Sequence, residues 1–216
     1  MERYVSIGKT NFRYHLLPHL VLGMLLCLVA PLAMSIENLN ELQSARIVEL
    51  FLSLLGVVFF VPQFLPDQDK DIRDLLSSKK EPMLTVHLIR LLEALVCLLI
   101  LMAIFLICLK QGECVFDFAK LYFGGIISAL FLGGLGIFFY ALFDNIAIAY
   151  MIPVLYYILS YGAGKKLDNF YLFSLLRDSL TEKYYLLFAS VILIALGISY
   201  RCIGKRNVIM MMKQKG

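Results

Sequence analysis

The sequence predicts an all-α membrane protein that crosses the bilayer six times. Hydrophobic residues make up 61% of its 216 residues, and the mean hydropathy is +0.82. One water-soluble core cannot bury so large an apolar fraction. Six apolar stretches each approach the roughly 20 residues that a helix needs to cross about 30 Å of hydrocarbon. These stretches are continuous and do not alternate between polar and apolar positions, which is typical of membrane helices.

The uninterrupted apolar stretches place the expected elements in order. The membrane helices are residues 16–34, 47–65, 87–109, 121–143, 146–161 and 184–200. The other segments are an N-terminal interfacial helix at 1–15, a charged segment at 66–86, a segment at 162–183 and a tail at 201–216. We therefore expect a single transmembrane domain.

The distribution of basic residues predicts the orientation. With six crossings, thirteen of the twenty Lys and Arg residues fall on the side of the two termini and the 66–86 segment, and seven fall on the other side. Because cytoplasmic loops carry the excess of Lys and Arg, both termini and the 66–86 segment are expected in the cytoplasm. The 162–183 segment, which holds four of the seven, is expected on the outer face.

The 66–86 segment contains the one long polar stretch with a helical pattern of its own. Pro66 ends the second apolar run, and the aspartates at 67 and 69 can cap a new helix. The apolar residues Ile72, Leu75 and Leu76 then fall on one face. A calcium loop is disfavoured, because Ile72 occupies the position where an EF-hand needs glycine. We expect a short amphipathic helix that contacts lipid or a groove on a partner.

The fourth apolar run carries small residues at four-residue spacing, namely Gly125, Ala129 and Gly133. Small residues on one helix face let another helix approach closely, so this face predicts tight helix packing. A contact between two protomers is one form that this packing could take.

The segment at 162–183 is apolar in part but too short to cross. Residues 169–178 fit a re-entrant or interfacial helix on the outer face, and an ordered surface loop fits them equally well.

Two pairs of charged residues lie near helix ends. Arg46 can pair with Glu49 at the outer end of the second run, and Arg90 with Glu93 near the start of the third. Long side chains at such positions reach water, so both pairs are interpreted as membrane anchors.

No catalytic, metal or nucleotide site is expected. The Gly8-Lys9-Thr10 triplet lacks the upstream glycine and strand of a phosphate-binding loop, and His15 and His19 lack a third metal ligand nearby. The basic residues gather beside apolar runs and form no aromatic-interleaved patch, which argues against nucleic acid. We predict that the chain is not an enzyme and holds no cofactor.

The charged stretch at 69–80, Asp-Lys-Asp-Ile-Arg-Asp-Leu-Leu-Ser-Ser-Lys-Lys, resembles in order and place a motif of the membrane subunits of ABC-2 type transporters. In that family an acidic stretch after the second span leads into a Leu-Leu-Ser turn and then basic residues. Residues 5–14 are similar to the family's leading interfacial helix, and residues 169–178 to its short outer-face helices.

The resemblance implies a permease subunit of an ATP-driven exporter in a plasma membrane, typically bacterial. It implies as partners a separate ATPase subunit, a second permease subunit of the same or a sister kind, and membrane lipid. The 66–86 segment would then hold the coupling helix. The residues implied in coupling are Asp69, Asp71, Ile72, Arg73, Asp74, Leu75 and Leu76.

Two other functions are compatible with the sequence. A secondary carrier should show ionisable residues or broken helices at mid-membrane depth in matching halves, and here only Pro153 interrupts a run near its middle. A membrane scaffold subunit of a larger complex needs no site at all.

Overall fold

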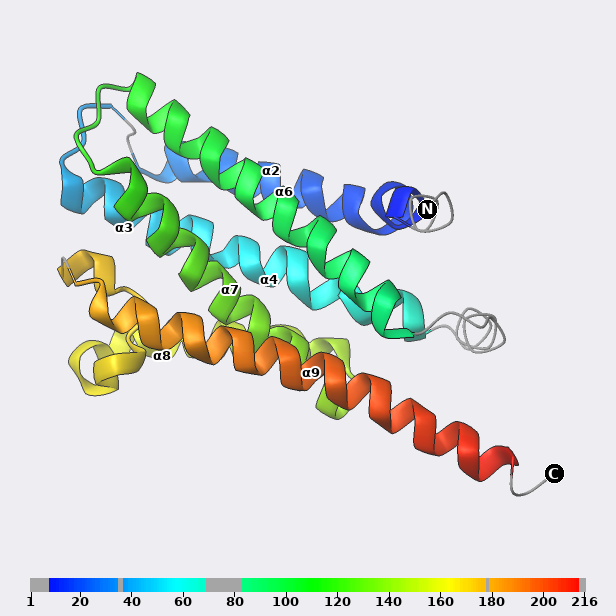
Figure 1. The fold of residues 1–216 in the computed structure, drawn as a ribbon. Helices are drawn as coiled ribbons and strands as arrows, with labels where there is room; N and C mark the ends of the chain where they lie inside the picture. Colours follow the sequence, from blue (N-terminus) through cyan, green and yellow to red (C-terminus); the bar gives the residue numbers. More distant parts are fainter. Residues whose placement is uncertain (1–7, 35–36, 69–82, 178, 214–216) are drawn as a thin grey trace.

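The computed structural model describes residues 8–34, 37–68, 83–177 and 179–213, and the regular structure there is entirely helical (Figure 1). The α-helices are α2 (Leu17–Ala33), α3 (Glu41–Phe51), α4 (Leu55–Phe60), α6 (Met83–Gln111), α7 (Phe118–Phe143), α8 (Ile146–Ala163) and α9 (Thr181–Lys213). The shorter elements are a π-helical turn η1 (Phe12–Leu16) and the 3₁₀ helices η2 (Leu52–Leu54), η3 (Val61–Gln68), η4 (Gly164–Phe170) and η5 (Ser174–Arg177).

The chain is an all-helical, multi-pass membrane protein. In the part of the chain that the structure describes, five helices are long and apolar enough to cross a membrane, and a sixth apolar helix, Ile146–Gly162, is shorter. The five are Gly8–Ala33, Glu41–Pro66, Met83–Gln111, Phe118–Phe143 and Thr181–Cys202. The predicted fold class is confirmed to this extent.

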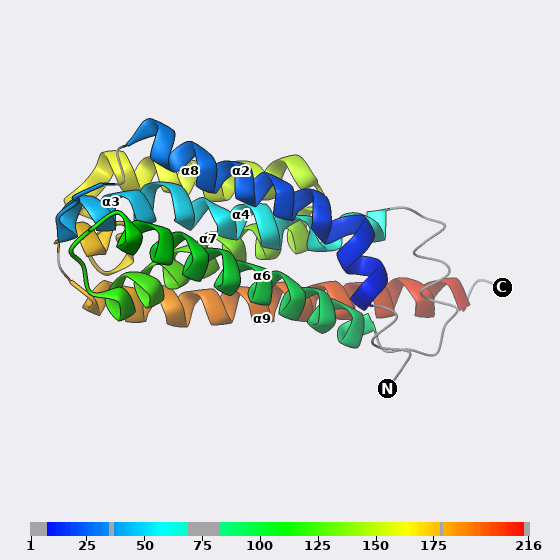
Figure 2. The same ribbon diagram turned by 90° about the horizontal axis from the view of Figure 1, so that it is seen from above.

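The first helix differs from the expected boundary at residue 16. It begins by Gly8 and continues to Ala33, so residues 8–15, which the sequence assigns to a separate interfacial helix, are continuous with the first apolar helix. The π-helical turn η1 lies at the junction, and Pro18 follows it. Both features bend helices, and in Figure 2 the first turns, in dark blue, leave the axis of α2.

Polar caps explain where three of the helices begin. The Asn40 side chain accepts a hydrogen bond from the Gln43 amide, and the Gln43 side chain accepts one from the Asn40 amide, which forms a capping box. The side chain of Asp117 caps α7, and that of Asn145 caps α8. Asp144, just before, has a φ of 49°, a left-handed conformation that Asp tolerates. The α7–α8 connection is therefore only two residues long.

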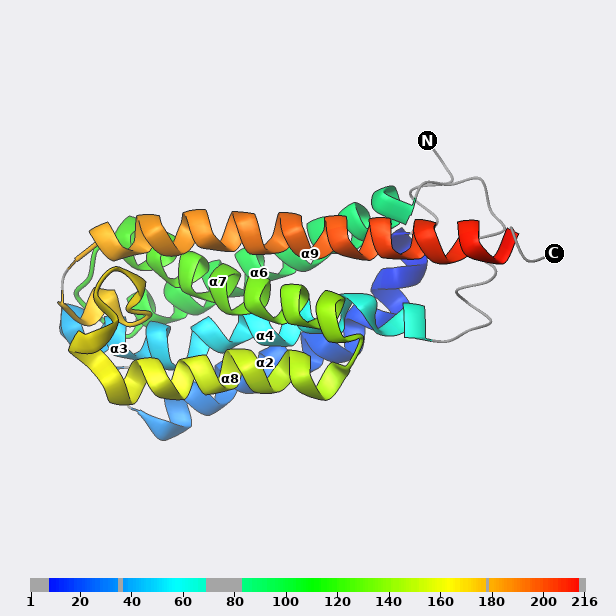
Figure 3. The same cartoon turned by 90° about the horizontal axis from the view of Figure 1, so that it is seen from below.

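Helix α7 lies at the centre of the bundle, between α9 on one side and α4 and α8 on the other (Figure 3). At its closest approach to the second span, a Cβ atom on Gly56 would lie 1.7 Å from the carbonyl oxygen of Ala129. A Cβ on Gly125 would meet Val48, and one on Gly133 would meet Phe60. The small-residue face of α7 thus packs against the second span of the same chain.

The two ends of the bundle differ. One end holds the start of the first helix, the end of α9, the end of η3 and the start of α6 (Figures 1 and 3). We call it the terminal end. The opposite end holds the connections from α2 to α3, from α6 to α7 and from α8 to α9, and we call it the loop end. Elements η4 and η5 lie there, and residues 171–175 are buried against the bundle.

Candidate functional site at the loop end

A buried ion pair joins the second and the last span. Glu49 of α3 and Lys183 of α9 are 134 positions apart in the sequence, and the distance between Glu49 Oε1 and Lys183 Nζ is 2.7 Å. The side chain of Lys183 is 1% exposed and that of Glu49 is 0% exposed. Charges removed from water in this way are costly unless they are paired and hydrogen-bonded. The free-energy cost of burying these two charges therefore depends on the hydrogen bonds that surround them.

The Lys183 ammonium uses all three of its donors. Besides Glu49, it donates to the hydroxyl oxygen of Ser128 on α7 and to the carbonyl oxygen of Leu172, both at 2.6 Å. Glu49 Oε1 also accepts from the Leu175 amide at 3.1 Å. One ammonium group thus holds together the second span, α7, α9 and the segment between η4 and η5.

The position of Lys183 in its helix makes the pairing with Glu49 necessary. Lys183 lies in the first turn of α9, which begins at Thr181. The exposed amides at a helix N-terminus repel a cation, so a buried lysine here needs a nearby carboxylate. Glu49 supplies it from within an apolar stretch.

The second oxygen of this carboxylate, Glu49 Oε2, is buried and has no hydrogen-bond partner among the described residues. The hydroxyl oxygens of Ser44 and Ser174, one on α3 and one on η5, share this property. The polar centre is therefore well bonded at the ammonium and incompletely bonded around the carboxylate.

The structure corrects the expected pairing of Glu49 with Arg46. The carboxylate of Glu49 binds Lys183, while Arg46 lies on the exposed surface of α3. Three positions separate the two residues, but Glu49 points into the bundle and is fully buried. The interpretation of Glu49 as a surface anchor is therefore wrong.

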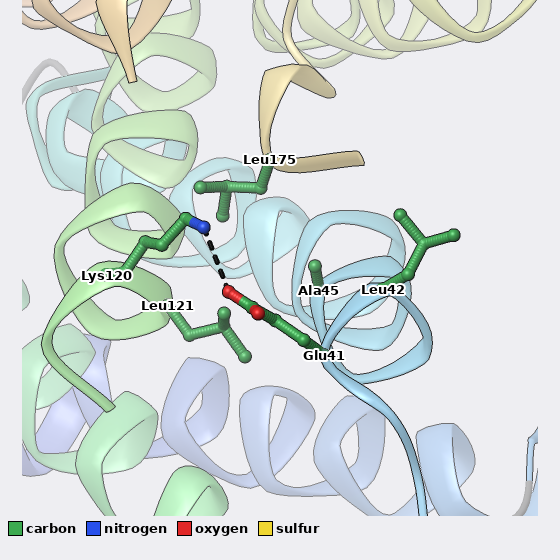
Figure 4. A pocket seen from close by; sticks show the side chains of 6 residues that line it. All are labelled: Glu41, Leu42, Ala45, Lys120, Leu121 and Leu175. Atoms are coloured by element: carbon green, nitrogen blue, oxygen red, sulfur yellow. Dashed lines mark hydrogen bonds and ion pairs between the residues drawn. The ribbon is translucent and has the colours of Figure 1, made fainter. Parts of the chain in front are cut away.

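A pocket opens at the loop end (Figure 4). It has a volume of about 140 Å³ and is lined by Glu41, Leu42, Ala45, Lys120, Leu121 and Leu175. Lys120 Nζ and Glu41 Oε1 form an exposed ion pair 2.9 Å long at its edge. Leu175 connects pocket and ion pair, because its side chain lines the pocket and its amide donates to Glu49.

A second group of polar and aromatic side chains gathers at the terminal end. We call it the terminal-end cluster, and its members are Gln63, Phe64, His87, Arg90, Tyr140, Asp144 and Arg201.

The Phe64 ring is central to this cluster. Its centroid lies 5.0 Å from that of His87 and 5.7 Å from that of Tyr140, and the Arg201 guanidinium lies over it at 5.4 Å. Arg201 also pairs with Asp144 in the α7–α8 turn. The cluster thus joins η3, α6, α7 and α9 at one end of the bundle.

Arg90 and Glu93, expected to pair as a membrane anchor, bond to residues of other elements, and Arg90 is buried instead of reaching water. Arg90 Nη1 donates to the Gln63 carbonyl oxygen at 3.1 Å. Glu93 Oε2 accepts from the Asn11 side-chain amide at 2.7 Å, which ties the first helix to α6. Both residues therefore contribute to contacts between helices at the terminal end.

The seven residues expected to couple to a partner, Asp69, Asp71, Ile72, Arg73, Asp74, Leu75 and Leu76, lie outside the described residues. Their expected helix stays a prediction. Within the described ranges, no group of three or more His, Cys, Asp or Glu side chains is placed to hold a metal ion.

Lys183 is the functional candidate that the sequence did not reveal. It counted only as one of seven outer basic residues, and nothing local indicates its partner. The available signal was Glu49 itself, a carboxyl group inside an apolar run, which favours a buried cationic partner elsewhere in the chain.

Comparison with protein families, with curated proteins and with solved structures gives no match for this chain.

Proposed function

We propose that the chain is the membrane-spanning permease subunit of an ABC-2 type exporter in a plasma membrane. A second permease subunit would complete the pathway, and a separate ATPase would bind the 66–86 segment. The terminal end is then cytoplasmic and the loop end faces outward. The sixth apolar helix, Ile146–Gly162, is the sixth span in this proposal. It is shorter than the other five, and the residues on either side of it would complete the crossing at the membrane–water interface.

One observation carries the coupling part of the proposal. Phe64 lies five residues before the 69–82 stretch and His87 five residues after it, and their rings are in contact in the terminal-end cluster. Through Arg201 and Tyr140 the same cluster reaches α9 and α7. A force applied to the stretch between Phe64 and His87 would therefore act on four spans together. This arrangement suits a subunit driven by a partner at that end.

A secondary carrier is less favoured by the position of the buried charges. Among the described residues, the buried pair of Glu49 and Lys183 most resembles the ionisable site of a carrier. However, Lys183 is the third residue of α9, so the pair lies near the loop end of the bundle. Carriers place their ionisable site near mid-membrane, between matching halves.

The proposal is tested by purifying the tagged chain from its native host in mild detergent. We expect an ATPase with a phosphate-binding loop to copurify, identified by mass spectrometry and by ATP hydrolysis in the complex. Exchanging the charges with Arg73→Asp and Asp74→Arg should lower the copurified ATPase activity roughly tenfold, which corresponds to about 1.4 kcal/mol of lost binding. The net charge of the chain does not change.

The matched control exchanges two exposed charges at the loop end that lie outside the pocket, with Lys110→Glu and Glu113→Lys, and should leave the activity unchanged. Equal activity in the two exchanged variants would contradict the coupling assignment. Reproducible absence of any ATPase would contradict the permease assignment and favour a scaffold.

A further inference from the structure

The segment at 171–175 is buried at the loop end although it belongs to no long helix. Its residues Leu172, Phe173 and Ser174 are fully buried. Four side chains from four different helices hold its backbone, and one of them is Ser128 of α7, whose hydroxyl donates to the Leu172 carbonyl oxygen at 3.4 Å. Ser160 accepts from the Leu172 amide at 3.0 Å, Lys183 donates to the Leu172 carbonyl oxygen, and Glu49 accepts from the Leu175 amide. The position of this segment therefore depends on side chains more than on its own helical hydrogen bonds.

The Leu175 side chain lies between the bundle interior and the 140 Å³ pocket, which we call the outer pocket. It packs so closely on α7 that a Cβ atom on Gly124 would lie 2.7 Å from Leu175 Cδ1. The same leucine lines the 140 Å³ pocket. Leu175 is therefore the residue that separates the pocket from the Glu49 carboxylate, to which its own amide donates.

We infer that the Glu49–Lys183 ion pair is a latch that holds residues 171–175 closed over the loop end, and that its release opens the outer pocket toward the bundle interior. The part of this inference that links release to transport rests on the proposed function.

The chemistry of the pair suits a reversible latch. Burying two charges costs about as much as their attraction returns, so a buried pair is a poor source of net stability. When the segment moves and water enters, both charges regain hydration, which offsets the lost attraction. Water that enters on opening would hydrate Glu49 Oε2, which makes no hydrogen bond of ordinary geometry in the closed state. The closed and open states therefore differ by an energy that a bound cargo or a moving helix can supply.

The test measures the accessibility of position 174 in nanodiscs, where both faces of the protein meet water. The variant Ser174→Cys is built in a background in which the five native cysteines are replaced by serine or alanine. Ser174 is fully buried, and the substitution exchanges only oxygen for sulfur. We expect slow reaction with a membrane-impermeant maleimide when the latch is intact. Adding Lys183→Met should raise the rate at least tenfold.

The matched control is Lys120→Met, which removes the lysine of the exposed pair at the edge of the same pocket and should leave the rate unchanged. A second variant guards against misfolding: Glu49→Gln with Lys183→Met removes both charges and leaves no buried charge alone. We expect it to elute as a folded protein and to react as fast as the single variant. A folded double variant that reacts as slowly as the intact latch would overturn the inference.

The link to transport is tested separately in the complex with the copurified ATPase. ATP turnover should raise the reaction rate of Ser174→Cys when the latch is intact. An unchanged rate during turnover would overturn the transport part of the inference. Failure to copurify an ATPase would instead overturn the proposed function, while the nanodisc result, which needs no partner, would still decide whether the latch exists.

Discussion

The Glu49–Lys183 pair shows how two buried charges can fix the position of a segment and yet, as a pair, contribute little net stability. The Lys183 ammonium is bonded to three oxygens from three elements, and the side chain of Lys183 is 1% exposed. Removing the lysine would leave Glu49 as a lone buried charge, and removing the glutamate would leave the lysine alone. At the residue scale, loss of one partner is therefore worse than loss of both.

We predict that Lys183→Met lowers the free energy of unfolding by about 3–5 kcal/mol, the usual cost of breaking a buried pair. Glu49→Gln combined with Lys183→Met should recover most of this loss. Unfolding by SDS in mixed micelles, followed by circular dichroism, measures both.

Lys120→Met is the reference for this prediction, because the side chains of Lys120 and Glu41 are 18% and 51% exposed. Exposed pairs contribute about 0–1 kcal/mol, so the reference should unfold almost as the native chain does. Equal losses from the two lysine substitutions would show that burial of the Lys183 pair has no energetic consequence.

At the scale of elements, the contact between the second span and α7 is the closest in the described bundle of those that involve a glycine. Gly56 allows the α4 backbone to approach Ala129, and the neighbouring small residues of α7 continue the same face. Backbones this close gain dispersion contacts along the whole helix pair. The second span is consequently buried more than any other described span.

We predict that Gly56→Ala destabilises the protein by at least about 1–3 kcal/mol, because the added methyl group forces the two backbones apart. Gly162→Ala is the control, since a Cβ there meets no atom within 4 Å. That substitution should be neutral or stabilise α8 by up to about 1 kcal/mol. Thermal unfolding of the two purified variants side by side decides the matter, and a Gly56→Ala variant as stable as the control would contradict the packing described here.

The helices were predictable and their pairings were not. Each apolar run corresponds to a helix, because an apolar run of about 20 residues is by itself a strong indication of a membrane-spanning helix. The second helix starts at Glu41, earlier than the expected residue 47, because the Asn40 capping box adds a polar first turn outside the apolar run.

The candidate site was only half predictable for a related reason. Glu49 is conspicuous as a charge within an apolar run, but its partner lies 134 residues away. Arg46 was the expected partner because it lies three positions away, but in the folded bundle the Glu49 carboxylate pairs with Lys183. Local spacing carries no information about contacts that distant.

At the scale of the whole molecule, the charged contacts of α9 lie at the two ends of the bundle. Lys183 binds Glu49 at the loop end, and Arg201 binds Asp144 at the terminal end. Helix α9 is therefore joined to neighbouring elements at both ends of the bundle, and a rigid α9 would transmit movement from one end to the other. If the chain is the permease proposed above, such a connection would let the release of one end depend on the state of the other.

The distance along α9 between these two ion pairs also sets the bilayer thickness that fits the protein best. Lys183 and Arg201 are 18 residues apart on one continuous helix, which corresponds to about 27 Å. The carboxylate partner at the terminal end, Asp144, is 52% exposed and must remain in water. A thicker bilayer would force lipid against it, and a thinner one would leave apolar helix surface wet.

We therefore predict that the unfolding temperature in nanodiscs is highest for lipids whose hydrocarbon layer is close to about 27 Å and falls for both shorter and longer acyl chains. The double variant Glu49→Gln with Lys183→Met, which frees one end of α9, should show a broader optimum. An unfolding temperature independent of chain length would contradict this prediction. If it holds, the two ion pairs restrict the membranes in which this protein is stable, as well as holding its helices together.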